Sequence, residues 1–110
     1  MAGSFELIKA RDGRYFYHLK AGNGEVILTG TLQSDKATAR EGIEAVRRQA
    51  ARDAAFERMI SVRGDPYFVL RAGASDIVGT SEMYAEPAAM EKGIASVKQN
   101  APLATVRDQT

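Results

Sequence analysis

His18 is the only histidine in this chain of 110 residues, and the chain contains no cysteine. A thiolate nucleophile, a disulfide framework and a multi-histidine metal site are therefore excluded, and we expect no metal ion and no cofactor. Acid–base catalysis at His18 would need a nucleophile and an orienting carboxylate close by, for which Ser4 and Glu6 are the available groups. No spacing in the sequence selects either of them, so the alternative interpretation is an exposed or half-buried histidine on a strand.

Glu6 recurs as Glu57 at a distance of 51 residues, and Lys20 has the cation Arg71 at the same distance. Two carboxylates placed symmetrically could flank a reaction centre. The interpretation that we favour is that each carboxylate pairs with a cation across the strand, such as Lys20 or Arg71.

Aromatic and basic side chains alternate on two predicted strands. Phe16, His18 and Lys20 point to one side of the first strand, and Tyr67 and Arg71 point to the same side of its repeat. Such a face could stack nucleic-acid bases and contact phosphates, or it could meet a second protein. It could also be a solvated sheet with a few exposed aromatic residues. The candidate binding residues are Phe16, Tyr67, Lys20, Arg71 and His18.

The overall charge of the chain offers no bulk attraction for nucleic acid or for an anionic membrane. Fifteen basic and fourteen acidic residues give a net charge of +1, and 45% of the residues are hydrophobic. The sequence contains no apolar run of the roughly 20 residues that a membrane span requires. Glu6 and Lys9 interrupt the apolar residues near the start, and Ala2 stands where N-myristoylation needs glycine. We expect a cytoplasmic protein without a membrane partner.

These residues lie in two copies of one unit. Shifted by 51 residues, the chain matches itself without a gap, with twelve identities between positions 5–50 and 56–101. A fixed period of this length indicates two supersecondary units, and a unit of about 50 residues is marginal by itself. We therefore expect a single compact domain over residues 1–110, with the repeats at 1–51 and 52–110 sharing one core.

Each unit is predicted to contain three strands followed by a helix. Aromatic and branched residues between turn signals favour strands, and apolar residues at helical spacing favour an amphipathic helix. The strands are expected at 5–10, 15–20 and 25–29, with counterparts at 56–61, 67–71 and 76–80. A short strand at 104–108 follows the second helix, and its counterpart at 53–59 runs into the first strand of the second unit.

Caps and glycines define the two helices. Asp35 and Glu86 stand at the predicted N-caps, and Pro87 fits the first helical position. Gly42 and Gly93 occur in the middle of the helices, where glycine costs about 1 kcal/mol relative to alanine. Because this cost recurs at the same position of both units, we expect the helix backbone to lie close to the sheet there.

The segments 5–7, 19–27 and 42–47 resemble the YegP-like family of small bacterial proteins of unknown function, most specifically in the run Leu-Lys-Ala-Gly-Asn-Gly. The resemblance implies two β(3)-α-β units that build one sheet by exchanging their C-terminal strands, so that residues 104–108 would lie against strands of the first repeat. The second copy departs from the motif, because Ala74-Ser75-Asp76 replaces Asn23-Gly24-Glu25. The resemblance supplies no catalytic residues.

We therefore predict an α+β fold with one antiparallel sheet, pseudo-two-fold symmetry and both helices on one face. The sequence does not select a function. Our leading hypothesis is a non-enzymatic binding module that uses the helix-free sheet face to meet a protein partner or a second copy of the chain. The alternatives are a nucleic-acid-binding module that uses the same face and a small enzyme that uses His18 with a nearby carboxylate.

Overall fold

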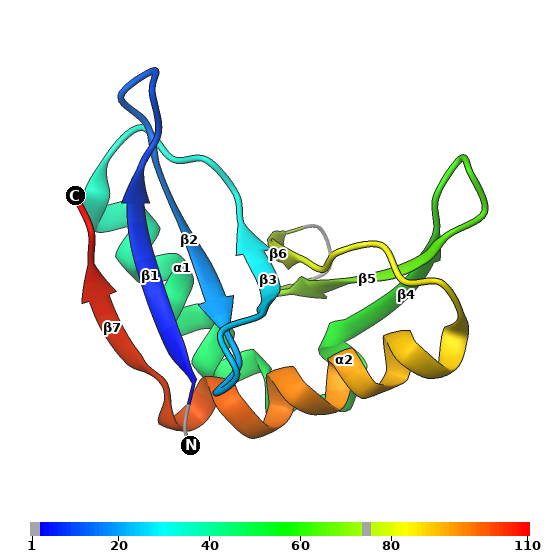
Figure 1. The fold of residues 1–110 in the computed structure, drawn as a ribbon. Helices are drawn as coiled ribbons and strands as arrows, with labels where there is room; N and C mark the ends of the chain where they lie inside the picture. Colours follow the sequence, from blue (N-terminus) through cyan, green and yellow to red (C-terminus); the bar gives the residue numbers. More distant parts are fainter. Residues whose placement is uncertain (1–2, 74–75) are drawn as a thin grey trace.

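The computed structural model describes residues 3–73 and 76–110, and Figure 1 shows its arrangement. The predicted turn at Ala74 and Ser75 lies outside the described residues, as does Ala2. The first repeat contains β1 (Ser4–Lys9), β2 (Tyr15–Lys20), β3 (Val26–Gly30) and α1 (Lys36–Gln49). The second contains β4 (Phe56–Ile60), β5 (Pro66–Arg71), β6 (Ile77–Thr80), α2 (Pro87–Asn100) and β7 (Thr105–Asp108). The predicted α+β class and its tandem units are confirmed.

All seven strands form one sheet in the order β4-β5-β6-β3-β2-β1-β7. The repeats join at its centre, where β3 and β6 are antiparallel and pair Thr29 with Thr80 and Gly30 with Gly79. Thr29 and Thr80 are equivalent positions of the two units, so the pseudo-two-fold axis passes between them.

The strand that follows α2 pairs with the first repeat, as the resemblance implied. After α2, β7 lies beside β1 and runs parallel to it, with Ser4 opposite Thr105 (Figure 1). This pair is the one parallel contact in a sheet whose other pairs are antiparallel within the described residues. After α1, β4 pairs antiparallel with β5. The predicted strand at 53–59 is too long, because Asp53–Ala55 forms a 3-10 turn that leads the chain from the helix into the sheet edge.

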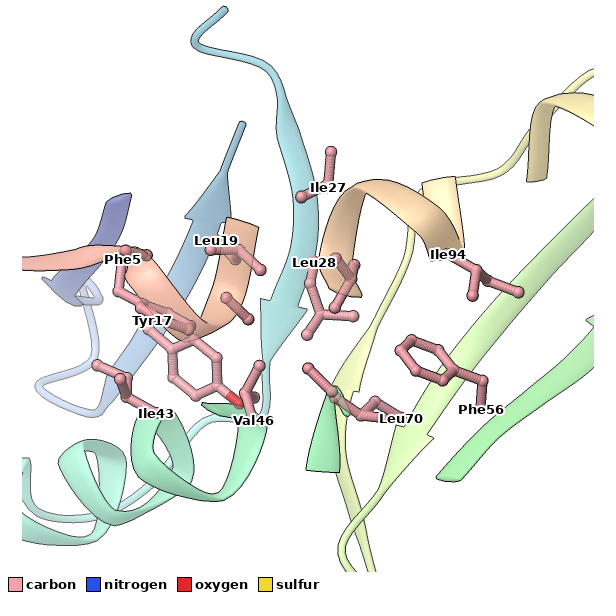
Figure 2. Packing of buried hydrophobic residues seen from close by; sticks show 14 of the residues in the cluster. Phe5, Tyr17, Leu19, Ile27, Leu28, Ile43, Val46, Phe56, Leu70 and Ile94 are labelled. Carbon is pink, nitrogen blue, oxygen red and sulfur yellow. The ribbon is translucent and has the colours of Figure 1, made fainter. Parts of the chain in front are cut away.

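Both helices cover the same face of the sheet. Alternating residues of the strands point to them, so Phe5, Leu7, Tyr17 and Leu19 are almost completely buried. Figure 2 shows Tyr17 beside Ile43 and Val46 of α1, and Phe56 and Leu70 near Ile94 of α2. Burying one such large side chain contributes about 1.5–3 kcal/mol. The core cluster therefore draws on both repeats.

Local signals in the sequence explain where the elements begin. Asp35 caps α1, since its Oδ1 accepts the Thr38 backbone N–H at 2.7 Å. Glu86 precedes α2 as predicted, but its side chain makes no capping hydrogen bond, and Pro87 begins the helix. In the β2–β3 turn the Asn23 Oδ1 accepts the N–H of Glu25, and Gly24 has a φ of +87° that favours glycine. Neither helix is long and apolar enough to cross a membrane, as judged over the described residues.

Candidate functional site

The helix-free face of the sheet carries every candidate residue that the sequence suggested. One row of directly paired residues crosses all seven strands on this face. In spatial order the row is Arg107, Glu6, His18, Thr29, Thr80, Val69 and Glu57. His18 and Val69 are equivalent positions of the two repeats. The backbone positions of the row are therefore symmetric, but the side chains in its two halves differ.

The two carboxylates that occupy equivalent positions of the repeats pair with cations on this face. Lys20 lies 3.0 Å from Glu6, and Arg71 lies 2.5 Å from Glu57. The predicted cross-strand pairing is confirmed at both positions. Each carboxylate faces a cation rather than the other carboxylate, and each cation already has an anionic partner.

Phe16 is one of the apolar residues on this face. Its ring meets the His18 ring edge to face, with centroids 5.3 Å apart. A pocket of about 530 Å³ lies beside it, in a region lined by the segment that leaves β3 and by the threonines of the central strands. The lining residues are Ala10, Phe16, Thr29, Gly30, Thr31, Leu32 and Thr80. Leu32 is 43% exposed, so an apolar side chain stands at the mouth of this pocket.

His18 is half-buried and lies directly opposite Glu6 on β1. Burial lowers its pKa, an effect that the carboxylates of Glu6 and Glu82 oppose and that Lys20 reinforces. Within residues 3–73 and 76–110, no side chain hydrogen-bonds to the imidazole. The ring has a charged neighbour but no bonded nucleophile, and the geometry does not assemble a catalytic set around it.

The five predicted binding residues share a face without forming one patch. Phe16 and His18 are in contact, but Tyr67 and Arg71 lie on β5, which is separated from β2 by β3 and β6. Three strand spacings amount to roughly 14 Å. Phe16 and Tyr67 are equivalent positions of the two repeats, and the pseudo-two-fold axis places them in opposite halves of the same sheet face.

Sequence reasoning missed the residues that build the pocket. Thr29 and Thr80 are identical residues at equivalent positions of the repeats. Leu32 and its counterpart Met83 are both apolar and exposed, at 43% and 52%. An apolar residue recurring in a predicted loop was the available signal. No cluster of three or more potential metal ligands occurs among the described residues.

Comparison with known proteins places the chain in a family. The model of a domain of unknown function, DUF1508, matches twice, at residues 10–57 and 61–108. The chain belongs to the DUF1508 family. Its two matches are again 51 residues apart, which supports the internal repeat.

Full-length relatives and solved structures agree with this assignment. A UPF0339 protein of Acinetobacter baylyi is 46% identical over 110 residues, covering 100% of this chain and 99% of the relative. The UPF0339 protein YegP of Escherichia coli K12 is 44% identical over 110 residues, with 100% of both chains covered.

The solution structure of the E. coli YegP protein matches with a TM-score of 0.93 and 43% identity, covering 100% of this chain and 95% of that one. A UPF0339 protein of Shewanella oneidensis matches with a TM-score of 0.91 and 41% identity, covering 98% and 92%. The resemblance to the YegP-like family is thus confirmed. The names of these relatives state no activity, as expected for a family of unknown function.

Proposed function

We propose that this protein is a non-enzymatic module that binds a protein partner through the helix-free face. The pocket beside Phe16 carries the proposal. Its volume of about 530 Å³ has ample room for an apolar side chain of a partner, and Leu32 adds apolar surface at its mouth. Hydroxyls of Thr29, Thr31 and Thr80 provide hydrogen-bonding groups around it. The partner expected from this chemistry presents an apolar side chain within a polar rim.

The ion pairs support a protein over a nucleic acid. Nucleic-acid binding takes much of its free energy from cations that neutralise phosphates. Lys20 and Arg71 are instead engaged by Glu6 and Glu57 within the sheet face. Protein interfaces combine aromatic residues with charged groups that are paired or lie at the rim, which is the pattern here.

Photo-crosslinking followed by direct binding tests this proposal. A photoreactive residue at position 32 should crosslink one protein in cells. The same residue at position 62 is the control: Val62 is fully exposed, at 107%, but lies in the β4–β5 turn and does not line the pocket, so it should not crosslink that protein. The crosslinked protein is then purified and titrated by calorimetry. Phe16→Ala should weaken its binding at least about tenfold, as truncation of a buried interface aromatic does, and Val62→Ala should leave binding unchanged.

Three results would overturn the proposal. Unchanged calorimetric affinity in Phe16→Ala places the interface elsewhere. Salt-dependent binding of single-stranded RNA or DNA in fluorescence anisotropy, weakened by Lys20→Ala, assigns the face to nucleic acid. A crosslink from position 32 to a second copy of this chain, together with a dimer mass in light scattering, makes the face a self-association surface. The proposal includes a cytoplasmic location, which fractionation of cells would check.

A further inference from the structure

Two rows of directly paired side chains cross β2, β1 and β7 on the helix-free face, next to the β2–β3 turn. The first row is Lys20, Ser4 and Thr105, and the second is His18, Glu6 and Arg107. A pocket of about 260 Å³ lies over these rows, and all of their side chains except that of His18 line it. β7 therefore completes a polar pocket that β1 and β2 begin.

The groups that line this pocket are mainly hydrogen-bond donors. Lys20 lies 3.0 Å from Glu6, which engages one of the three N–H groups of the ammonium. Arg107 lies opposite Glu6 but forms no ion pair within residues 3–73 and 76–110. The hydroxyls of Ser4 and Thr105 have no hydrogen-bond partner in the described part of the chain. Donors of two cations and two hydroxyls are thus available to a ligand.

The β2–β3 turn adds a backbone donor. The Gly24 N–H donates to the Ala21 carbonyl oxygen, and the Glu25 N–H donates to the Asn23 side chain. The Gly22 N–H has no such acceptor among the described residues, and Gly22 lines the pocket. Turns with unpaired backbone N–H groups are common binding places for anions.

The charges at the pocket sum to one positive charge. Glu6 is the one carboxylate among the described lining residues, and Lys20 and Arg107 are the cations. Asp108, the next residue of β7, pairs with two cations of α1 on the helix side of the sheet. His18 lies beside Glu6, and burial lowers its pKa, so it is mostly neutral at pH 7. The pocket therefore attracts an anion.

We propose that this pocket binds a phosphate group, with Lys20 and Arg107 on its two sides and the hydroxyls of Ser4 and Thr105 between them. Proteins contact phosphate oxygens through these donor types: Arg, Lys, Ser, Thr and backbone N–H groups. One surplus positive charge suits a single phosphate and not the chain of phosphates in a nucleic acid. Either the free phosphate ion or a small phosphomonoester can supply the group.

The second repeat does not reproduce this set of donors. Ala55 replaces Ser4, and among the described residues no strand lies beside β4 to supply counterparts of the β7 side chains. The pocket at the equivalent place, of about 320 Å³, is lined by Arg52 and Arg71 but by no hydroxyl of the described chain. The phosphate site thus depends on β7, and a Ser4→Ala variant imitates the second repeat at one position.

A titration followed by backbone amide NMR shifts tests the site, at constant pH and at an ionic strength held constant with sodium chloride. The probes are inorganic phosphate, glycerol 1-phosphate and acetate. We expect saturable shifts at Ser4, Gly22 and Thr105 with phosphate, with a dissociation constant on the order of 1 mM for a ligand this small. Acetate, which has fewer oxygens, should bind at least fivefold more weakly.

The probes also distinguish the two sources of the phosphate group. Tighter binding of glycerol 1-phosphate than of inorganic phosphate would identify an ester, and equal or weaker binding would identify the free ion. Absence of saturable shifts at the three amides with both phosphate probes would overturn the proposal. Binding of acetate as tight as that of phosphate would also contradict it, because the site would then be a general anion site.

Two substitutions should change the affinity for inorganic phosphate in opposite directions. Arg107→Gln should weaken binding at least fivefold, because it removes a charged donor. Arg63→Gln, which changes an exposed cation in the β4–β5 turn, should leave binding unchanged. Glu6→Gln should tighten binding at least twofold, because it removes the like charge from the pocket. Glu57→Gln, the equivalent change in the second repeat, should have no effect.

Tighter binding cannot result from a damaged fold, so the Glu6→Gln variant keeps the test decisive. Weaker or unchanged binding in Glu6→Gln, or unchanged binding in Arg107→Gln, would overturn the proposal. If the β7 amide shifts show that Arg107→Gln detaches the strand, Ser4→Ala decides in its place and should weaken binding at least threefold. The phosphate pocket shares no lining residue with the pocket beside Phe16. Phe16→Ala should therefore leave these titrations unchanged, which separates a failure here from a failure of the proposed protein-binding function.

Discussion

The two repeats place an aromatic ring at the same point between helix and sheet, but they hold it differently. Tyr17 lies over Gly30, in the space that a side chain there would occupy, and reaches Val78 of the other repeat. In the second repeat Ser81 stands where the first has Gly30, and its hydroxyl accepts the Phe68 backbone N–H at 2.9 Å. The first ring therefore joins the two repeats, whereas the second is held within its own.

The two repeats also differ at the edges of the sheet. Beyond β1 the first repeat gains β7, and α1 holds this strand through Lys36 and Arg40, which pair with Asp108 at 2.5 and 3.0 Å. Beyond β4 no further strand pairs among the described residues. The equivalent strands β1 and β4 thus differ in position: β1 lies inside the sheet beside β7, and β4 forms its edge among the described residues.

Exchanging the equivalent residues Gly30 and Ser81 should have the largest effect on the free energy of unfolding. Gly30→Ser places a side chain inside the Tyr17 ring, and we expect about 3 kcal/mol or more of destabilisation from overpacking. Ser81→Gly removes one buried hydrogen bond and should cost only about 1–2 kcal/mol. Urea unfolding followed by circular dichroism measures both. Gly73→Ala is the control, since nothing lies within 4 Å of the position of its added Cβ, and a Gly30→Ser loss no larger than the control's would contradict this account of Tyr17.

The next largest loss of stability is expected when the cation over the first core ring of each repeat is removed. Arg47 lies 5.6 Å from the Phe5 ring and donates to the Ala104 carbonyl oxygen at 2.6 Å, just before β7. Lys98, its equivalent, lies 5.5 Å from the Phe56 ring. Arg47→Ala should cost about 2 kcal/mol, because it removes both the ring contact and a charged hydrogen bond.

Lys98→Ala should cost clearly less than Arg47→Ala, since its ion pair with Asp53 is exposed. Thermal unfolding of the two variants makes the comparison. Hydrogen exchange of β7 amides sharpens it, because only Arg47→Ala should accelerate exchange there. Equal losses in the two variants would show that Arg47 does not hold the strand.

Removing the hydroxyl of Tyr17 or of Tyr84 should give a smaller difference in the free energy of unfolding than the substitutions above. Burial raises the pKa of both Tyr17 and Tyr84. Only the Tyr17 hydroxyl has a hydrogen-bond acceptor among the described residues, the Val78 carbonyl oxygen. Tyr17→Phe should therefore cost about 1 kcal/mol, and Tyr84→Phe close to nothing. Chemical denaturation of the two variants decides, and a larger loss in Tyr84→Phe would reverse the assignment.

The smallest expected difference is between His18 and Val69, and it lies in how the free energy of unfolding depends on pH. Burial lowers the His18 pKa from its ordinary value of 6.5, so the folded protein binds this proton less tightly than the unfolded chain does. The contribution to stability is complete above the ordinary pKa and is lost as the pH falls through the lowered one. Unfolding free energies at pH 8 and pH 5 should differ less in His18→Val than in the wild type. An unchanged difference would show that His18 is not the group responsible.

Much of the fold was predictable because it depends on local patterns. The repeat, the strand and helix periodicities, the Asp35 cap and the side of the sheet to which Phe16, His18 and Lys20 point all follow from residue types at short spacing. The cross-strand pairs of Glu6 and Glu57 were predictable for the same reason, since each joins neighbouring strands of one unit.

The candidate sites were less predictable, because they depend on contacts between distant residues. Alternation assigns Phe16 and Tyr67 to one face but says nothing of the distance between them, which the antiparallel pairing of β3 with β6 determines. The pocket beside Phe16 depends on where the segment after β3 places Leu32, which no local pattern in the sequence indicates.

Hydrophobic periodicity and turn residues act over a few positions, so the sequence was sufficient to predict two copies of one unit with a shared core and helices on one face of antiparallel strands. Contacts between distant residues placed β7 parallel to β1, brought the Tyr17 hydroxyl to the other repeat, and set the Tyr84 hydroxyl against Gly93 where the first repeat has only the Tyr17 ring against Gly42. Side-chain volume and long-range pairing determine these contacts, since the interior of a protein is closely packed.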